Sequence, residues 1–217
     1  MTSRLLTVCN AATAAAAVVC GLGLSSVAHA QVYSFGCITA NDTTGTDCGI
    51  GASQFRLTLS GDSTHVVFRF DNIGTLASSM TDIYFGRGLN LGLVGASIIN
   101  GSGVSFSFGA SPGALPAGGA YSFSTSVDAD SNAPTAPNGV NPGETLSFRF
   151  LSSYTTVLGL MNTYAYNTVV GVHAQAFANG QSESLVTATP EPKTYTLMLA
   201  GLGAIGFIAR RRRRRQV

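Results

Sequence analysis

Alternation of apolar and polar residues between positions 55 and 71 constrains the fold of this chain more than any other feature. Residues 55–60 read Phe-Arg-Leu-Thr-Leu-Ser, and residues 66–71 read Val-Val-Phe-Arg-Phe-Asp. A period of two is typical of strands whose two faces meet different environments. A Gly-Asp-Ser turn at 61–63 separates the two segments. The pattern therefore predicts an antiparallel hairpin with its aromatic and leucine side chains on one face.

Other segments of the chain also have strand character. Those that we expect to form strands are residues 82–85, 96–99, 104–108, 145–150, 169–177 and 184–187. One short apolar stripe, between Thr155 and Tyr164, predicts an internal helix. Many short strands separated by Gly- and Pro-rich loops are typical of sandwiches and jelly rolls. We therefore expect a mainly β chain with a single antiparallel β-sandwich or jelly-roll-like domain.

The first 30 residues have the pattern of a secretory signal peptide. Arg4 precedes an apolar segment at 5–27, and Ala28 and Ala30 form an A-x-A cleavage site. Cleavage there starts the mature chain at Gln31. A retained first transmembrane helix is the alternative, and the small residues at the cleavage site argue against it.

The C-terminal segment contains a second apolar run. Pro190, Glu191 and Pro192 precede uncharged residues from Thr194 to Ala209. At 1.5 Å per residue this run covers roughly 24 Å, slightly less than the ~30 Å hydrocarbon core of a bilayer. We expect a short transmembrane helix; a buried core helix or a basic nucleic-acid patch are the alternatives. The cations that flank the run, and that favour a cytoplasmic C-terminus, are Lys193, Arg210, Arg211, Arg212, Arg213, Arg214 and Arg215.

The order of these parts resembles a known sorting signal. Pro190-Glu191-Pro192, a helix containing residues 199–203 and a terminal arginine cluster resemble the PEP-CTERM signal of Gram-negative bacteria. In that family an exosortase, an integral-membrane cysteine transpeptidase, recognises the signal and removes the tail. The resemblance implies a transient inner-membrane intermediate, with its N-terminal domain outside and its C-terminus inside, and then delivery to the cell surface or extracellular matrix. The chain is thus divided into signal peptide 1–30, exported domain 31–189 and sorting signal 190–217.

The exported domain is acidic. The whole sequence has 12 Lys and Arg residues against 10 Asp and Glu residues. Between 31 and 189 only four arginines remain against nine carboxylates, so the formal charge is four minus nine, or −5. Such a domain is poorly suited to binding phosphate backbones, and we expect no nucleic-acid partner. The four arginines are Arg56, Arg69, Arg87 and Arg149.

Cys37 and Cys48 are the two cysteines that remain after signal cleavage. In an oxidising compartment they predict one disulfide, worth roughly 3 kcal/mol of stability. A metal site needs more ligands than this pair, and neither His65 nor His173 is close in sequence. We expect a disulfide, no metal site and no cofactor.

Three motifs with possible chemistry are weak. Residues 109–113 match the G-x-S-x-G pattern of a nucleophile elbow around Ser111, but glycines and a proline follow where the elbow needs a long helix. His65 and His173 lie in strand patterns without a positioned nucleophile. Residues 128–132 begin like a calcium loop but lack its glycine and its final glutamate, which favours an Asx-rich turn and leaves calcium binding by another geometry as the alternative. We therefore assign no catalytic residue.

Two functional hypotheses follow. The first is a non-enzymatic envelope or extracellular-matrix protein, associated with biofilm and exopolysaccharide. The alternative is a carbohydrate-binding module for exopolysaccharide, with a hydrolase less favoured because the sequence spacing pairs none of its carboxylates across the about 5 to 10 Å that glycosidases need. Tyrosines that could form a sugar-stacking platform are Tyr84, Tyr121, Tyr154, Tyr164 and Tyr166.

Overall fold

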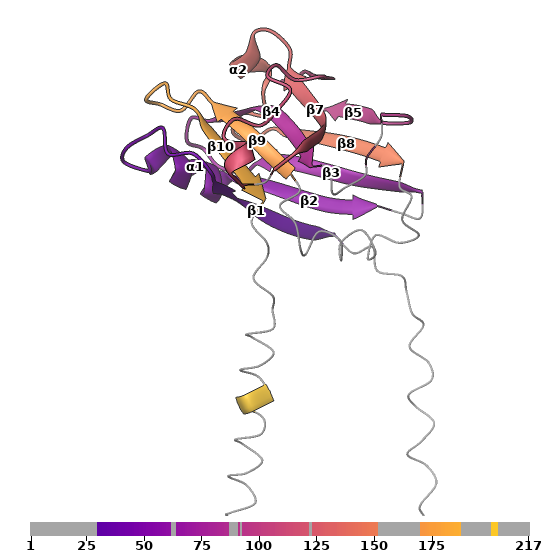
Figure 1. Cartoon of the computed structure of the whole chain (residues 1–217), viewed down its shortest axis with the longest axis horizontal. Helices are drawn as coiled ribbons and strands as arrows, with labels where there is room; N and C mark the ends of the chain where they lie inside the picture. Colours follow the sequence, from indigo (N-terminus) through magenta and orange to yellow (C-terminus); the bar gives the residue numbers. More distant parts are fainter. Residues whose placement is uncertain are drawn as a thin grey trace, which may run out of the picture.

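The computed structural model describes residues 30–61, 64–86, 91, 93–121, 123–151, 170–187 and 201–203. Short helices lie between the strands: α1 (Thr46–Gln54), the 3-10 helix η3 (Gly118–Tyr121) and α2 (Thr135–Asn138). Helix α1 packs beside β1 and β10, and α2 beside β4 and β7 (Figure 1). The strands are β1 (Gln31–Cys37), β2 (Phe55–Gly61), β3 (His65–Asn72), β4 (Ser79–Gly86), β5 (Ser97–Asn100), β6 (Phe106–Phe108), β7 (Thr125–Ser131), β8 (Thr145–Leu151), β9 (Val170–Gln175) and β10 (Glu183–Thr187).

All of these strands belong to one antiparallel sheet, in the order β5-β8-β3-β2-β1-β10-β9-β4-β7-β6. Strand β1 joins its two parts, because residues 31–34 pair with β2 and residues 35–37 pair with β10. We call β5-β8-β3-β2 with the start of β1 the first half-sheet, and the end of β1 with β10-β9-β4-β7-β6 the second half-sheet.

The two edges of the sheet also meet. The Asn100 side chain of β5 accepts a hydrogen bond from the N–H of Phe106 in β6 and donates one to its carbonyl. The mainly β, antiparallel prediction is confirmed. The two half-sheets face each other as the expected sandwich layers would, but they are continuous through β1 and form one nearly closed sheet.

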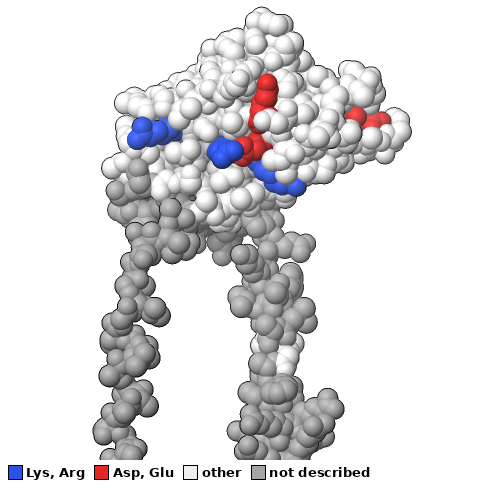
Figure 2. Space-filling view, turned by 180° about the vertical axis from the view of Figure 1, so that it is seen from behind, with Lys and Arg blue, Asp and Glu red and all other residues white. Residues whose placement is uncertain are grey.

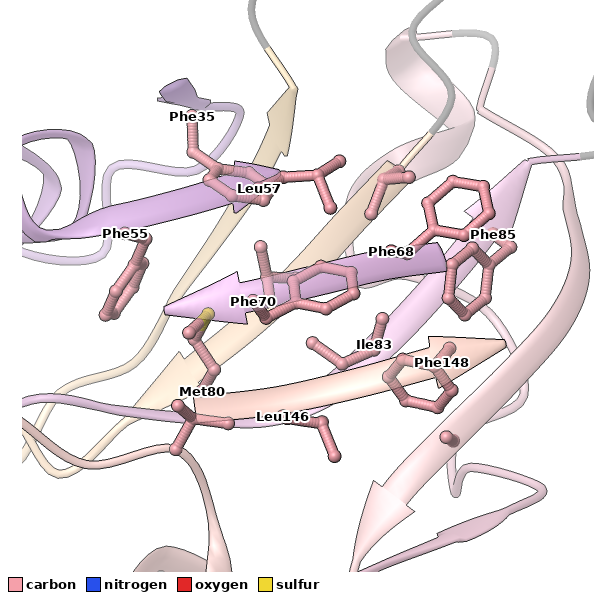
Figure 3. Close-up of a cluster of buried hydrophobic side chains, with 14 of the residues drawn as sticks. Phe35, Phe55, Leu57, Phe68, Phe70, Met80, Ile83, Phe85, Leu146 and Phe148 are labelled. Carbon is pink, nitrogen blue, oxygen red and sulfur yellow. The ribbon is translucent and has the colours of Figure 1, made fainter. Parts of the chain in front are cut away.

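The core lies between the two half-sheets and is dominated by phenylalanine (Figure 3). Phe85 of β4 lies edge-on to Phe68 of β3 and to Phe148 and Phe150 of β8, with ring centroids 5.1 Å apart in each case. Such edge-to-face pairs add about 0.5–1.5 kcal/mol each to the energy of burial. The rings therefore join the two half-sheets at the centre of the molecule.

The predicted hairpin is confirmed as β2 and β3. Leu57 pairs with Phe70 and Leu59 with Phe68, so the apolar residues share the inner face as the alternation indicates. The other predicted strands correspond to β4, β5, β6, β8, β9 and β10, each with shifted ends. Strands β1 and β7 were not predicted.

Helix α1 was also not predicted, because two glycines in nine residues disfavour a helix. Packing explains Gly51, since a Cβ there would lie 2.8 Å from a methyl group of Leu185 in β10. The predicted disulfide between Cys37 and Cys48 is present, with the two Cα atoms 5.7 Å apart, and it ties α1 to β1. Close packing and a covalent bond thus hold a helix of poor intrinsic propensity.

Several predicted features lie outside the described residues. They are the signal peptide up to His29, the helix at 155–164, the turn at 62–63 and residues 190–192 of the sorting motif. Of the predicted C-terminal helix, residues 201–203 are described and are helical. Among the described residues, no helix has the length and apolarity needed to span a membrane.

Candidate functional site

Polar residues form a line across the outward face of the second half-sheet. Ser184 of β10 pairs with His173 of β9, and His173 pairs with Asp82 of β4. Asp82 in turn pairs with Asp130 of β7, which pairs with Ser107 of β6. The sheet register therefore brings two serines, an imidazole and two carboxyl groups from five strands into one line.

The two carboxyl groups of this line interact directly. Burial raises the pKa of Asp82 to about 6, the hydrogen bond from Thr81 opposes that rise, and the Asp130 carboxylate adds to it. The Thr81 hydroxyl donates to Asp82 over 2.8 Å, whereas Oδ1 of Asp130 is buried without a hydrogen-bond partner in the described structure. Asp82 is only 4% exposed and Asp130 is half-buried, so Asp82 retains a proton inside the fold below about pH 6.

His173 and Ser184 resemble half of an acyl-transfer site but lack access. Nδ1 of His173 lies 3.3 Å from the Ser184 hydroxyl. Burial lowers the pKa of His173, and the nearby Glu183 partly opposes this, so the imidazole is mainly neutral at pH 7. Ser184 is 1% exposed, and a substrate carbonyl cannot reach its hydroxyl.

We call the outward face of the second half-sheet the covered face, because residues 109–121 and Phe123 lie over part of it. Leu115 and Phe123 pack with Tyr84 of β4 and Ile38 in a second, smaller apolar cluster. The Tyr84 hydroxyl donates to the carbonyl of Pro112 over 3.0 Å. In the G-x-S-x-G stretch Ser111 is exposed, and the next helical element is the four-residue η3. The segment therefore lacks the long helix of a nucleophile elbow, as predicted.

The expectation of an Asx-rich turn at residues 128–132 is wrong. Residues 128–131 lie in β7, where Asp128 accepts a 2.6 Å hydrogen bond from the N–H of Ala110 and Asp130 faces Asp82. The polar residues point to the covered face, and Val127 and Ala129 point to the core. Among the described residues, no three His, Cys, Asp or Glu side chains are grouped closely enough to hold a metal ion.

The outward face of the first half-sheet, which we call the open face, carries Arg56 of β2, Arg69 of β3 and Arg149 of β8. Arg56 pairs with Asp71, Arg69 with Thr58 and Ser147, and Arg149 with Val67. Each arginine is therefore diagonal to the next across one strand boundary. Figure 2 shows Lys and Arg side chains on the face that it presents, with Asp or Glu side chains directly beside the middle basic group. Sequence alternation places Arg56 and Arg69 on one face, but pairing with β8 is needed to add Arg149.

Each of these arginines is held by a local contact. Nη1 of Arg56 donates to the carbonyls of Ala52 and Phe55. Arg69 forms an ion pair with Asp71 at 2.7 Å, and its side chain remains 56% exposed. Nη2 of Arg149 lies 3.0 Å from Nδ1 of His65, which places this predicted spectator histidine beside a cation. These contacts orient all three side chains; Arg69 and Arg149 remain exposed, and Arg56 is half-buried.

The tyrosines do not form the proposed stacking platform within the described residues. Tyr84 is fully buried in the smaller apolar cluster, and Tyr121 of η3 is 53% exposed. Tyr154, Tyr164 and Tyr166 lie outside the described residues. Of these five tyrosines, Tyr121 is therefore the one that the described structure shows with an exposed ring.

Comparison with known proteins identifies one segment. Residues 188–214 match the family model described as the PEP-CTERM protein-sorting motif. The match includes Pro190, Glu191 and Pro192 and begins directly after β10, which ends at Thr187. No curated protein and no solved structure matches the chain.

Proposed function

We propose, from the premise that this chain is an exported PEP-CTERM sorting domain-containing protein processed by an exosortase, that its β domain is a non-enzymatic structural component of the cell envelope or extracellular matrix. The observation that carries the proposal is the sorting motif, which starts one residue after the last strand. The domain is thus the cargo of the signal. A phenylalanine core and a disulfide suit a protein that must persist outside the cell.

The polar line on the covered face supports a structural role for its residues. Asp82 and Ser184 are buried, and their contacts join β4, β7, β9 and β10. An enzyme needs at least one reactive group that substrate can touch. A carbohydrate-binding role is the second candidate, favoured by the arginines and hydroxyl groups of the open face.

A complementation experiment tests the structural proposal. A strain lacking the protein is complemented with the wild-type chain, with Ser184→Ala, or with the triple change Pro190→Ala, Glu191→Ala and Pro192→Ala. We expect wild type and Ser184→Ala to restore matrix cohesion equally, and the triple variant to stay in the membrane fraction. Loss of cohesion with a stably folded Ser184→Ala protein would show that the serine acts chemically, and wild-type protein free in the medium would exclude a matrix component.

A further inference from the structure

We propose that the open face binds an acidic polysaccharide chain along the diagonal line formed by Arg56, Arg69 and Arg149. This deepens the proposed function and rests on it for one point only, the polymer that an envelope or matrix protein meets. The face itself follows from the sheet register, from charge and from exposure.

Charge is distributed unevenly over the domain. The open face carries three of the four arginines between residues 31 and 189. The strands of the first half-sheet contain one of the nine carboxylates, Asp71. The local charge of the open face is three minus one, or +2, and the remainder of the domain has −5 minus +2, or −7. A protein with few cations has therefore concentrated them on one accessible surface, where an anionic partner is attracted despite the acidic total.

The spacing of the cations suits a linear polymer. Diagonal neighbours in an antiparallel sheet are about 7–8 Å apart, so the three arginines form a line of roughly 15 Å across β2, β3 and β8. One carboxylate or phosphate cannot contact all three groups. A polymer that carries an anionic group on successive repeat units can contact all three arginines. Guanidinium groups also bind carboxylates through paired hydrogen bonds.

The residues around the arginines favour a sugar chain over a nucleic acid. Arg69 lies between Thr58 and Ser147 in the cross-strand register, and Ser60, Ser97 and Thr145 lie on the same outward face. Hydroxyl groups can exchange hydrogen bonds with sugar hydroxyls. The strand residues of the open face include no Phe, Tyr or Trp, which single-stranded nucleic acids need for base stacking.

The test uses the full chain in neutral detergent, with Arg210 to Arg215 replaced by Gln so that the tail cannot bind polyanions. The probes are a polyuronate, a neutral dextran and a polyphosphate of matched length, measured by titration calorimetry. We expect the polyuronate to bind, the dextran not to bind, and Arg69→Gln with Arg149→Gln to weaken polyuronate binding about tenfold. Polyuronate binding should also weaken as salt rises.

A charge-matched variant separates the open face from net charge. Adding Ala178→Lys and Gln181→Lys to the double variant restores the total charge on the exposed β9–β10 turn. We expect polyuronate binding to stay weak; recovery to the wild-type affinity would overturn the proposal. Arg149→Gln alone, at an exposed position, gives a second variant for which folding is not in question and should bind about threefold more weakly.

Other occupants give different results. Binding of polyphosphate without polyuronate would assign the face to phosphate groups, and concentration-dependent self-association that the double variant abolishes would assign it to a second copy of the chain. Either result overturns the polysaccharide assignment. Neither affects export or matrix cohesion in the complementation experiment, so failure of this inference remains distinct from failure of the proposed function.

Discussion

The two outward faces of the sheet differ in what their polar residues do. On the covered face, Asp82 and Ser184 are almost inaccessible. Asp82 accepts a hydrogen bond from Thr81 of its own strand, and the Ser184 hydroxyl lies 3.3 Å from His173 of the neighbouring strand. On the open face, Arg69 and Arg149 project into solvent and no described segment is packed over them. Asp82 and Ser184 are thus buried within the fold, whereas Arg69 and Arg149 remain exposed.

The largest effect that this comparison predicts is at the centre of the covered face. Tyr84→Ala should lower the free energy of unfolding by about 4 kcal/mol, because it empties a fully buried site and removes the contact with Leu115 and Phe123. Tyr84→Phe, which loses only the hydrogen bond to Pro112, should cost about 1 kcal/mol. Urea unfolding measures both values. Equal, small losses would mean that residues 109–123 contribute little to stability.

Loss of the disulfide should give the next largest effect, and this bond holds helix α1 against β1. Replacing Cys37 and Cys48 together with Ser should lower the free energy of unfolding by about 3 kcal/mol, since the bond closes a short loop in the unfolded chain. Hydrogen exchange should show the loss of protection first in α1, which packs on β1 and β10. Unchanged protection of α1 would show that packing around Gly51 is sufficient.

A pH effect distinguishes the two faces further. Because the pKa of Asp82 is about 6 in the folded state and about 3.9 in an unfolded chain, the fold binds this proton more tightly. The contribution of Asp82 to stability should therefore be greatest below about pH 4 and be lost as pH rises through about 6. Asp82→Asn keeps a neutral side chain and should be about 1–2 kcal/mol more stable than wild type at pH 8, with no difference at pH 4.

The titratable groups that surround Asp82 on the covered face are retained in that variant, and they are Asp128, Asp130, Tyr84 and His173. Urea unfolding at the two pH values measures the difference. A variant that is less stable than wild type at pH 8 would show that the carboxylate form is the one the fold stabilises.

The smallest effect is expected on the open face. Arg69→Gln removes an exposed ion pair with Asp71 and should change the free energy of unfolding by less than about 0.5 kcal/mol. The same substitution together with Arg149→Gln should weaken polyuronate binding markedly. A loss of stability comparable to that of Tyr84→Ala would remove the distinction between the two faces.

The sequence predicts the open face better than the covered face. Alternation identifies β2 and β3 and places Arg56 and Arg69 on one side, because most inner residues there are large and apolar. Strand β7 lacks this alternation of large apolar and polar residues. Its inward residues are Val127, Ala129 and Ser131, which are smaller than the phenylalanines of β3 and β8. In the sequence, the aspartates between them are typical of a turn. In the structure they lie in a strand and point to the covered face.

Long-range pairing explains the remaining differences. The polar line from Ser184 to Ser107 depends on the register of five strands, which no local pattern contains. In helix α1 a glycine is needed at position 51, because Leu185, which is far away in the sequence, leaves no room for a side chain there. By contrast, the disulfide and the sorting motif follow from composition and order within short segments, and both are found.

The pairing of β1 with β10 links the order of synthesis to the timing of folding. The last strand lies between the first strand and β9, so a chain emerging from its N-terminus has an unfilled gap in the sheet until residue 187 has crossed the membrane. The segment that follows is the sorting motif. Closure of the sheet and arrival of the signal at the membrane therefore fall at the same moment of export, and a chain that stalls before that point reaches neither.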